Sequence, residues 1–103
     1  MVLNLNPKHV KTLMQIFDSY CPNAEIWAYG SRVKNDCHEG SDLDLVVKNF
    51  NETNKNLGEL KQLINDSNIP ILVDIAEFDA LPETFQKEIL KYFVVLYKGK
   101  NFQ

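Results

Sequence analysis

The sequence predicts a small α/β (α+β) domain with helices packed on a single mixed β-sheet. Segments with helical spacing of apolar residues alternate with short apolar runs of strand type, in the order helix, strand, turn, strand, helix, strand, helix and a last short strand. This alternation favours one central sheet. The link between the first two strands, 31–41, is too short for the crossover helix of a parallel pair, so these strands are expected to be antiparallel neighbours.

Three helices follow from capping signals and apolar spacing. Asn6-Pro7 predicts a helix start, with Asn6 as the N-cap and Pro7 at the first helical position, and this helix is expected to end near Tyr20. A second helix is predicted over 53–66, with apolar residues on one face. A third begins after Pro82. Its apolar residues are expected to point inward: Phe85, Ile89 and Leu90.

Strands are predicted over 25–30, 43–47 and 69–78, and a helical turn is predicted over 31–33. The segment 93–97 is expected to be a last strand or an extended tail segment. Several large aromatic residues exceed what one small core obviously holds. Core packing is the expected role for most of them, with an oligomer or partner interface as the alternative: Trp27, Phe50, Phe93, Tyr97 and Phe102.

The composition indicates one domain, 1–103. The formal net charge of −3 disfavours nucleic acid as a partner, because a phosphate backbone needs a basic surface. Two cysteines make neither a disulfide framework nor a CxxC pair. No apolar run is long enough to cross a membrane, and the first residues lack the pattern of a secretory leader. We therefore expect a cytoplasmic protein with no membrane partner.

Two carboxylates on the second strand indicate a metal site. Asp42 and Asp44 are two residues apart, so they share a face of the strand with backbones roughly 6–7 Å apart. Such carboxylates repel each other unless a cation lies between them. Oxygen ligands favour magnesium or manganese. Asp74 is the candidate third carboxylate, because it interrupts an apolar strand, whereas Glu77 is expected on the opposite face.

The turn after the first strand has the residues of a phosphate site. Gly30 lets the backbone approach a ligand closely, and a helical turn opening at Ser31 would direct N–H groups toward an anion. The Ser31 hydroxyl can donate to a phosphate oxygen. Arg32 is the sole arginine and can add a charged fork. Each feature alone is common in turns and strand ends, and only their joint spacing predicts a nucleotide and metal site.

This joint pattern resembles the minimal nucleotidyltransferases of the DNA polymerase beta-like superfamily. The family pattern is Gly-Ser, a spacer of about ten residues, Asp-x-Asp and a later Asp. The matching residues here are Gly30, Ser31, Asp42, Asp44 and Asp74, with Arg32 and Ser41 in the flanking positions.

The resemblance implies a small mixed sheet with helices on one side and a Mg²⁺-dependent transfer of a nucleoside monophosphate to a hydroxyl. The donor is most often ATP, which gives AMP and releases pyrophosphate. Asp42 and Asp44 would bind two Mg²⁺ ions, with Mn²⁺ as a substitute, and Asp74 would complete the metal site and act as general base. Gly30 and Ser31 would hold the β- and γ-phosphates, with Arg32 as a further nucleotide contact.

Family members of this size are often paired with a small helical protein of the HEPN type, and this implies a homo- or hetero-oligomer. In such toxin–antitoxin pairs the nucleotidyltransferase is the antitoxin and attaches AMP to a tyrosine of the toxin. Two alternatives stay open. One is a nucleotide-binding antitoxin that neutralises its partner by contact without catalysis. The other is an enzyme acting on a small molecule such as an aminoglycoside, which the short chain disfavours.

Overall fold

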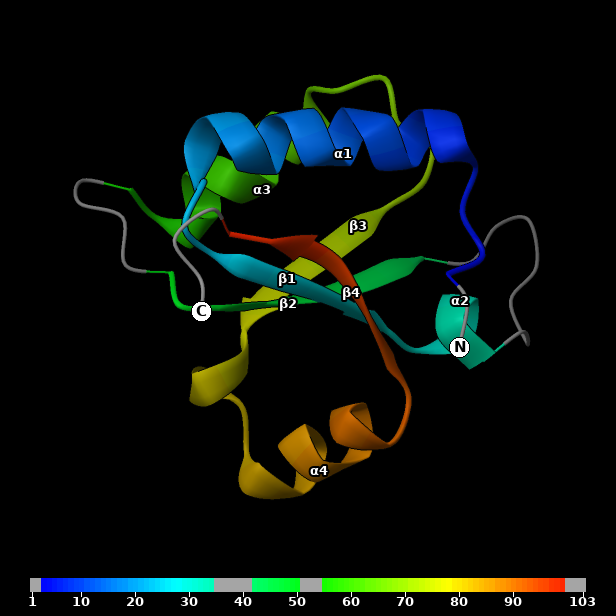
Figure 1. Cartoon of the computed structure of the whole chain (residues 1–103), viewed down its shortest axis with the longest axis vertical. Helices are drawn as coiled ribbons and strands as arrows, with labels where there is room; N and C mark the ends of the chain where they lie inside the picture. The colour runs from blue at the N-terminus through cyan, green and yellow to red at the C-terminus, as the bar shows by residue number, and fades with distance from the viewer. Residues whose placement is uncertain (1–2, 35–41, 51–54, 100–103) are drawn as a thin grey trace.

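The computed structural model describes residues 3–34, 42–50 and 55–99, which form a four-stranded mixed sheet in the order β3-β2-β1-β4 (Figure 1). β1 (Glu25–Tyr29) pairs antiparallel with β2 (Leu43–Lys48) and with β4 (Phe93–Lys98). β2 pairs parallel with β3 (Val73–Glu77). The predicted mixed sheet and the antiparallel pairing of its first two strands are therefore confirmed.

Helices cover both faces of the sheet (Figure 1). α1 (Pro7–Tyr20) and α3 (Leu57–Asn65) lie together on one face, and α4 (Glu83–Lys91) lies on the other. The short α2 (Ser31–Lys34) follows β1, and the 3₁₀ helix η1 (Phe78–Ala80) leads from β3 toward α4. The resemblance implies helices on one side only. That expectation is wrong for α4, because the second face of the sheet is also apolar.

Alternation along β2 creates the two apolar layers. Leu43, Leu45 and Val47 point into the larger core beneath α1 and α3. Val46 points to the other face, where it packs with Ile89 of α4. Successive side chains of a strand point to opposite faces, so the intervening Asp44 is directed to the α4 face.

The start of α1 follows the predicted capping pattern. The side-chain oxygen of Asn6 accepts a hydrogen bond from the backbone N–H of Lys8 at 2.9 Å, and Pro7 occupies the first turn. The helix ends at Tyr20, where the N–H of Cys21 still donates to the carbonyl of Phe17. An N-cap of this kind satisfies one of the free N–H groups at a helix start.

Two element boundaries differ from the prediction. α3 begins at Leu57, because Asn56 is extended and its side chain caps the helix by accepting from the N–H of Glu59 at 2.8 Å. The residues 53–54 at the predicted start lie outside the described part. β3 begins at Val73 rather than at residue 69, since its partner β2 begins only at Leu43.

The aromatic residues assigned to core packing make ring contacts. Trp27 lies 4.5 Å from Phe93 and 5.3 Å from Phe78 between ring centroids. Tyr97 and Phe50 contact aromatic rings of α1. Phe102 lies outside the described residues.

Fewer apolar side chains of α4 are buried than predicted. Ile89 is buried, but Leu90 is 49% exposed and Phe85 is 43% exposed. The expectation that Leu90 points inward is wrong. In the described ranges, no helix combines the length and apolarity that crossing a membrane requires.

Candidate active site

Three residues on neighbouring strands line up across the α4 face of the sheet. Tyr29 of β1 is the register partner of Asp44 in β2, and Asp44 is the register partner of Asp74 in β3. Asp42 precedes β2 by one residue and lies two positions from Asp44. The sheet therefore brings the three predicted carboxylates to one region, where β1 ends and β2 and β3 begin. Asp42, Asp44 and Asp74 together are called the row of carboxylates.

Gly30 adjoins this row through the carboxylate of Asp44. A Cβ atom added to Gly30 would lie 2.7 Å from Oδ2 of Asp44, closer than real Cβ contacts. Gly30 also has a φ of +84°, in the left-handed region that favours glycine. The backbone conformation therefore favours glycine, and a side chain here would displace the Asp44 carboxylate.

The row gathers negative charge on neighbouring strands. Burial raises the pKa of Asp44, and the nearby charges of Asp74 and Asp42 raise it further. Burial, followed by the charges of Asp44 and Asp74, raises the pKa of Tyr29 to about 12. A raised pKa means that the environment favours the neutral form of each group. A bound cation would favour the charged forms and so lower both pKa values.

The donor set fits a magnesium or manganese ion, because it consists of carboxylate oxygens. Within the ranges the structure describes, no three Asp, Glu, His or Cys side chains close around one point to form a complete metal cage. Magnesium commonly takes only one or two protein carboxylates and fills its octahedron with water and substrate phosphates. An open row of carboxylates suits that mode of binding.

The turn at Gly30 is fixed by backbone hydrogen bonds. The N–H groups of Val33 and Lys34 donate to the carbonyl of Gly30 at 3.0 and 3.3 Å. This short helix carries Ser31 at its first position, next to Gly30 and on the side of the row where β1 ends. The predicted helical turn over 31–33 is confirmed.

Arg32 has a structural partner that its sequence position does not reveal. Its side chain is buried, and Nη1 donates to the carbonyl oxygen of Asn4 at 2.8 Å, while the N–H of Asn4 donates to the Arg32 carbonyl at 2.7 Å. Arg32 thus holds the segment before α1 against the Gly30 turn. Its expected contact with phosphate stays a prediction.

Sequence reasoning missed the residues that surround the row. Tyr29 is one of them, and strand alternation relative to Asp44 could have identified it. A cavity of about 210 Å³ also adjoins Gly30, with walls from α2 and α4. Phe85 and Tyr92 line it, and no spacing rule connects them to the Gly-Ser turn because they follow it by more than fifty residues.

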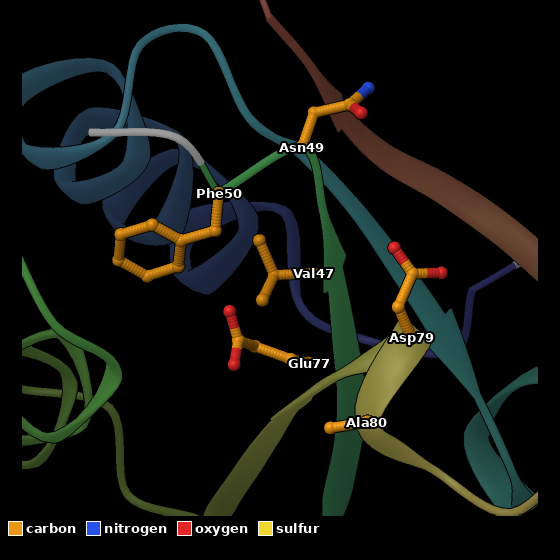
Figure 2. Close-up of a pocket in the computed structure, with 6 residues that line it drawn as sticks. All are labelled: Val47, Asn49, Phe50, Glu77, Asp79 and Ala80. Carbon is orange, nitrogen blue, oxygen red and sulfur yellow. The ribbon is translucent and has the colours of Figure 1, made fainter.

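A larger cavity of about 370 Å³ lies at the opposite end of β2 (Figure 2). Val47, Glu77 and Asp79 line it, and the register pairs Glu77 with Val47, whose side chain belongs to the core beneath α1 and α3. Glu77 therefore lies on the face opposite Asp74, as predicted. This cavity is separate from the row of carboxylates.

Comparison with known proteins identifies the family. The family model described as "Polymerase beta, Nucleotidyltransferase" matches residues 11–101. The chain belongs to this nucleotidyltransferase family. The match includes every predicted site residue, from the Gly-Ser turn to Asp74.

Individual proteins support this family assignment. The chain is 33% identical over 93 residues to the probable protein adenylyltransferase MntA of Haemophilus influenzae, covering 89% of this chain and 79% of MntA. It also resembles a crystal structure of a toxin–antitoxin with AMP-PNP, with a TM-score of 0.63 and 22% sequence identity over 93% of this chain and 76% of that chain. The second similarity supports the polymerase beta-like nucleotidyltransferase fold.

Proposed function

We propose that this nucleotidyltransferase is a cytoplasmic antitoxin that transfers AMP from ATP to a tyrosine hydroxyl of a HEPN-type toxin. The observation that carries the proposal is the register that sets Asp44 opposite Asp74, with Gly30 against the Asp44 carboxylate. The similarity to a protein adenylyltransferase supports a protein as acceptor and AMP as the transferred group. The fold shared with a toxin–antitoxin structure that holds AMP-PNP supports ATP and a toxin partner.

The roles of the carboxylates follow from their places on the sheet. Asp42 and Asp44 would hold two Mg²⁺ ions, or Mn²⁺, which would neutralise phosphate charge and align the displacement at the α-phosphorus. Asp74 lies on the edge strand β3, which an acceptor can reach from outside the sheet. There it would share in metal binding and accept the proton of the tyrosine hydroxyl. The hydroxyl oxygen then forms the new bond to the α-phosphorus, and pyrophosphate leaves with the electrons of the broken bond.

Gly30 and Ser31 would position the leaving pyrophosphate. Gly30 has no side chain to obstruct the approach of the phosphates beside Asp44, and the Ser31 hydroxyl can donate to a phosphate oxygen. Arg32 would support this turn through Asn4 and add positive charge beside the phosphates. Positioning and charge stabilisation supply most of the rate in phosphoryl transfer.

The test is transfer of radiolabel from α-labelled ATP to the protein encoded beside this chain's gene, with Mg²⁺ present. We expect label on a tyrosine of that protein with the wild type and at least a hundredfold less with Asp42→Asn/Asp44→Asn. Glu77→Gln/Asp79→Asn is the matched control, because it also removes two charges but at the opposite end of β2. Equal labelling by the Asp42/Asp44 double variant and the wild type would contradict the proposal.

A second candidate function is neutralisation of the partner by contact alone. It is favoured by exposed apolar side chains that a protein partner could cover: Leu63, Leu72 and Leu90. The two candidates differ in cells that express the toxin. If Asp42→Asn/Asp44→Asn protects such cells as well as the wild type does, contact and not catalysis is the function.

A further inference from the structure

The cavity beside Gly30 is bounded by the end of β1, by α2 and by α4. Its volume is about 210 Å³, and its lining includes Tyr29 and Gly30. It therefore adjoins the row of carboxylates, because Asp44 is the register partner of Tyr29 and its carboxylate lies where a Cβ of residue 30 would be.

Two aromatic side chains at this cavity are half exposed. Phe85 is 43% exposed and its ring meets that of Tyr29 edge-on at 5.9 Å. Tyr92 is 48% exposed, and the ammonium group of Lys34 lies 5.4 Å from its ring centroid. Ile89, which is buried, also lines the cavity. The cavity therefore offers aromatic and apolar surface next to the Gly-Ser turn.

We propose that this cavity binds the purine ring of the donor nucleotide, an inference that rests on the proposed function. The strand order β3-β2-β1-β4 separates the two sides of the site. Asp74, the candidate base for the acceptor hydroxyl, lies on the β3 side of Asp44, and the cavity lies on the β1 side. A nucleotide with its phosphates at Gly30 and Ser31 therefore has the cavity within reach and leaves the β3 edge open to the acceptor.

The size and lining of the cavity fit one flat ring system. Pockets that enclose whole drug-sized ligands measure roughly 300–1,000 Å³, so a cavity of about 210 Å³ suits a base without its sugar and phosphates. Aromatic side chains bind bases by stacking on their faces. Lys34 and Glu88 add one charged donor and one charged acceptor for the ring edge. The pKa of Glu88 is lowered by its hydrogen bond from Lys91 and the charge of that lysine, which keeps the carboxylate ionised.

The experiment compares the affinities of ATP and inorganic tripolyphosphate, each with Mg²⁺, by isothermal titration calorimetry. Phe85→Ala and Tyr92→Ala are expected to weaken ATP binding about tenfold and to leave tripolyphosphate binding unchanged. Leu90→Ala is the matched control, because Leu90 lies on the same helix with similar exposure and is not among the residues lining the cavity. Phe85→Leu keeps apolar volume and removes the ring, and circular dichroism verifies that each variant is folded.

The outcomes separate this inference from the proposed function. ATP binding at wild-type affinity in both Phe85→Ala and Tyr92→Ala would overturn the purine cavity alone. Equal losses of ATP and tripolyphosphate affinity would also overturn it, because the residues would then affect the phosphate turn. A wild-type protein that binds neither ligand would overturn the proposed function and the purine cavity together.

Discussion

A carboxylate oxygen of Asp44 occupies the space that a side chain on Gly30 would need, since a Cβ there would lie 2.7 Å from Oδ2. Two segments separated by the whole 31–43 stretch thus contact each other at the centre of the candidate site. A side chain at residue 30 would therefore displace the Asp44 carboxylate.

Gly30→Ala is expected to reduce AMP transfer at least a hundredfold. The added methyl displaces the Asp44 carboxylate, and the left-handed backbone costs a further 1–2 kcal/mol, roughly, in free energy of unfolding. Transfer assays and urea denaturation measure the two effects. Gly58→Ala in α3 is the control and should keep full activity, since its Cβ approaches only the side chain of Asn56. Activity of Gly30→Ala within twofold of wild type would show that the contact is irrelevant to transfer.

Asp44→Asn is expected to stabilise the metal-free protein at neutral pH. The pKa of Asp44 is raised by burial and by the charges of Asp74 and Asp42, so the folded state holds its proton more tightly than the unfolded state does. Wild-type stability therefore falls as pH rises from the ordinary aspartate pKa, about 3.9, through the raised value. Above that pH range the charged Asp44 destabilises the folded state by the full amount. Below it Asp44 is protonated in both states and this destabilisation is absent. Thermal unfolding of both proteins without divalent metal, at pH 3.5 and pH 7, measures the difference.

The control for this pH effect is Asp79→Asn, on the separate cavity at the other end of the sheet. It should not reproduce the stabilisation at pH 7. Added Mg²⁺ should raise the melting temperature of the wild type and have little effect on Asp44→Asn. A less stable Asp44→Asn protein at pH 7 without metal would contradict the account of repulsion.

Arg32→Ala is expected to lower the free energy of unfolding by about 1.5–3 kcal/mol, the usual contribution of a hydrogen bond from a charged group. The variant loses the bond from Nη1 to the Asn4 carbonyl and leaves that oxygen without this donor. Lys87→Ala, which removes an exposed cation paired with Glu83, should change stability by less than about 1 kcal/mol. The affinity for ATP is measured at a temperature where Arg32→Ala is folded. Unchanged affinity would assign Arg32 a structural role only.

Tyr20→Phe is expected to destabilise the contact between α1 and α3 by about 1–2 kcal/mol. The Tyr20 hydroxyl donates to Oε1 of Glu59 at 2.7 Å and accepts from the N–H of Asn56 at 3.0 Å, so it organises the start of α3. Urea denaturation provides the measurement. Tyr92→Phe, at a half-exposed tyrosine, is the control and should unfold like the wild type. A similar unfolding midpoint for Tyr20→Phe would show that water replaces these bonds without cost.

Local signals in the sequence predicted much of the fold. Asn6-Pro7 identified the start of α1, and the short 31–41 link identified the antiparallel pair. Boundaries that depend on residues far away in the sequence could not be predicted from local signals. β3 begins where its partner β2 begins, and α3 begins beside Asn56, whose N–H donates to the Tyr20 hydroxyl. The exposure of Leu90 depends on how α4 is rotated over the sheet, which no local pattern specifies.

The candidate site also combines features that local sequence signals predict with features that only tertiary packing determines. Spacing placed Asp42 and Asp44 on one face, and the interrupted apolar run identified Asp74. The bond between Arg32 and Asn4 and the cavity walls from α4 arise from tertiary packing between segments far apart in sequence. Because these contacts follow no period, sequence patterns gave no signal for them.

The position of β1 in the sheet also bears on the order of folding. β1 carries Tyr29 and leads into Gly30, and it is completed on one side by β2 and on the other by β4, with Glu25 opposite Lys98. Pairings between such distant residues close late, because the chain must first lose the entropy of a long loop. During synthesis on the ribosome, the strand that leads into Gly30 therefore lacks one of its two neighbours until residues 93–98 have emerged.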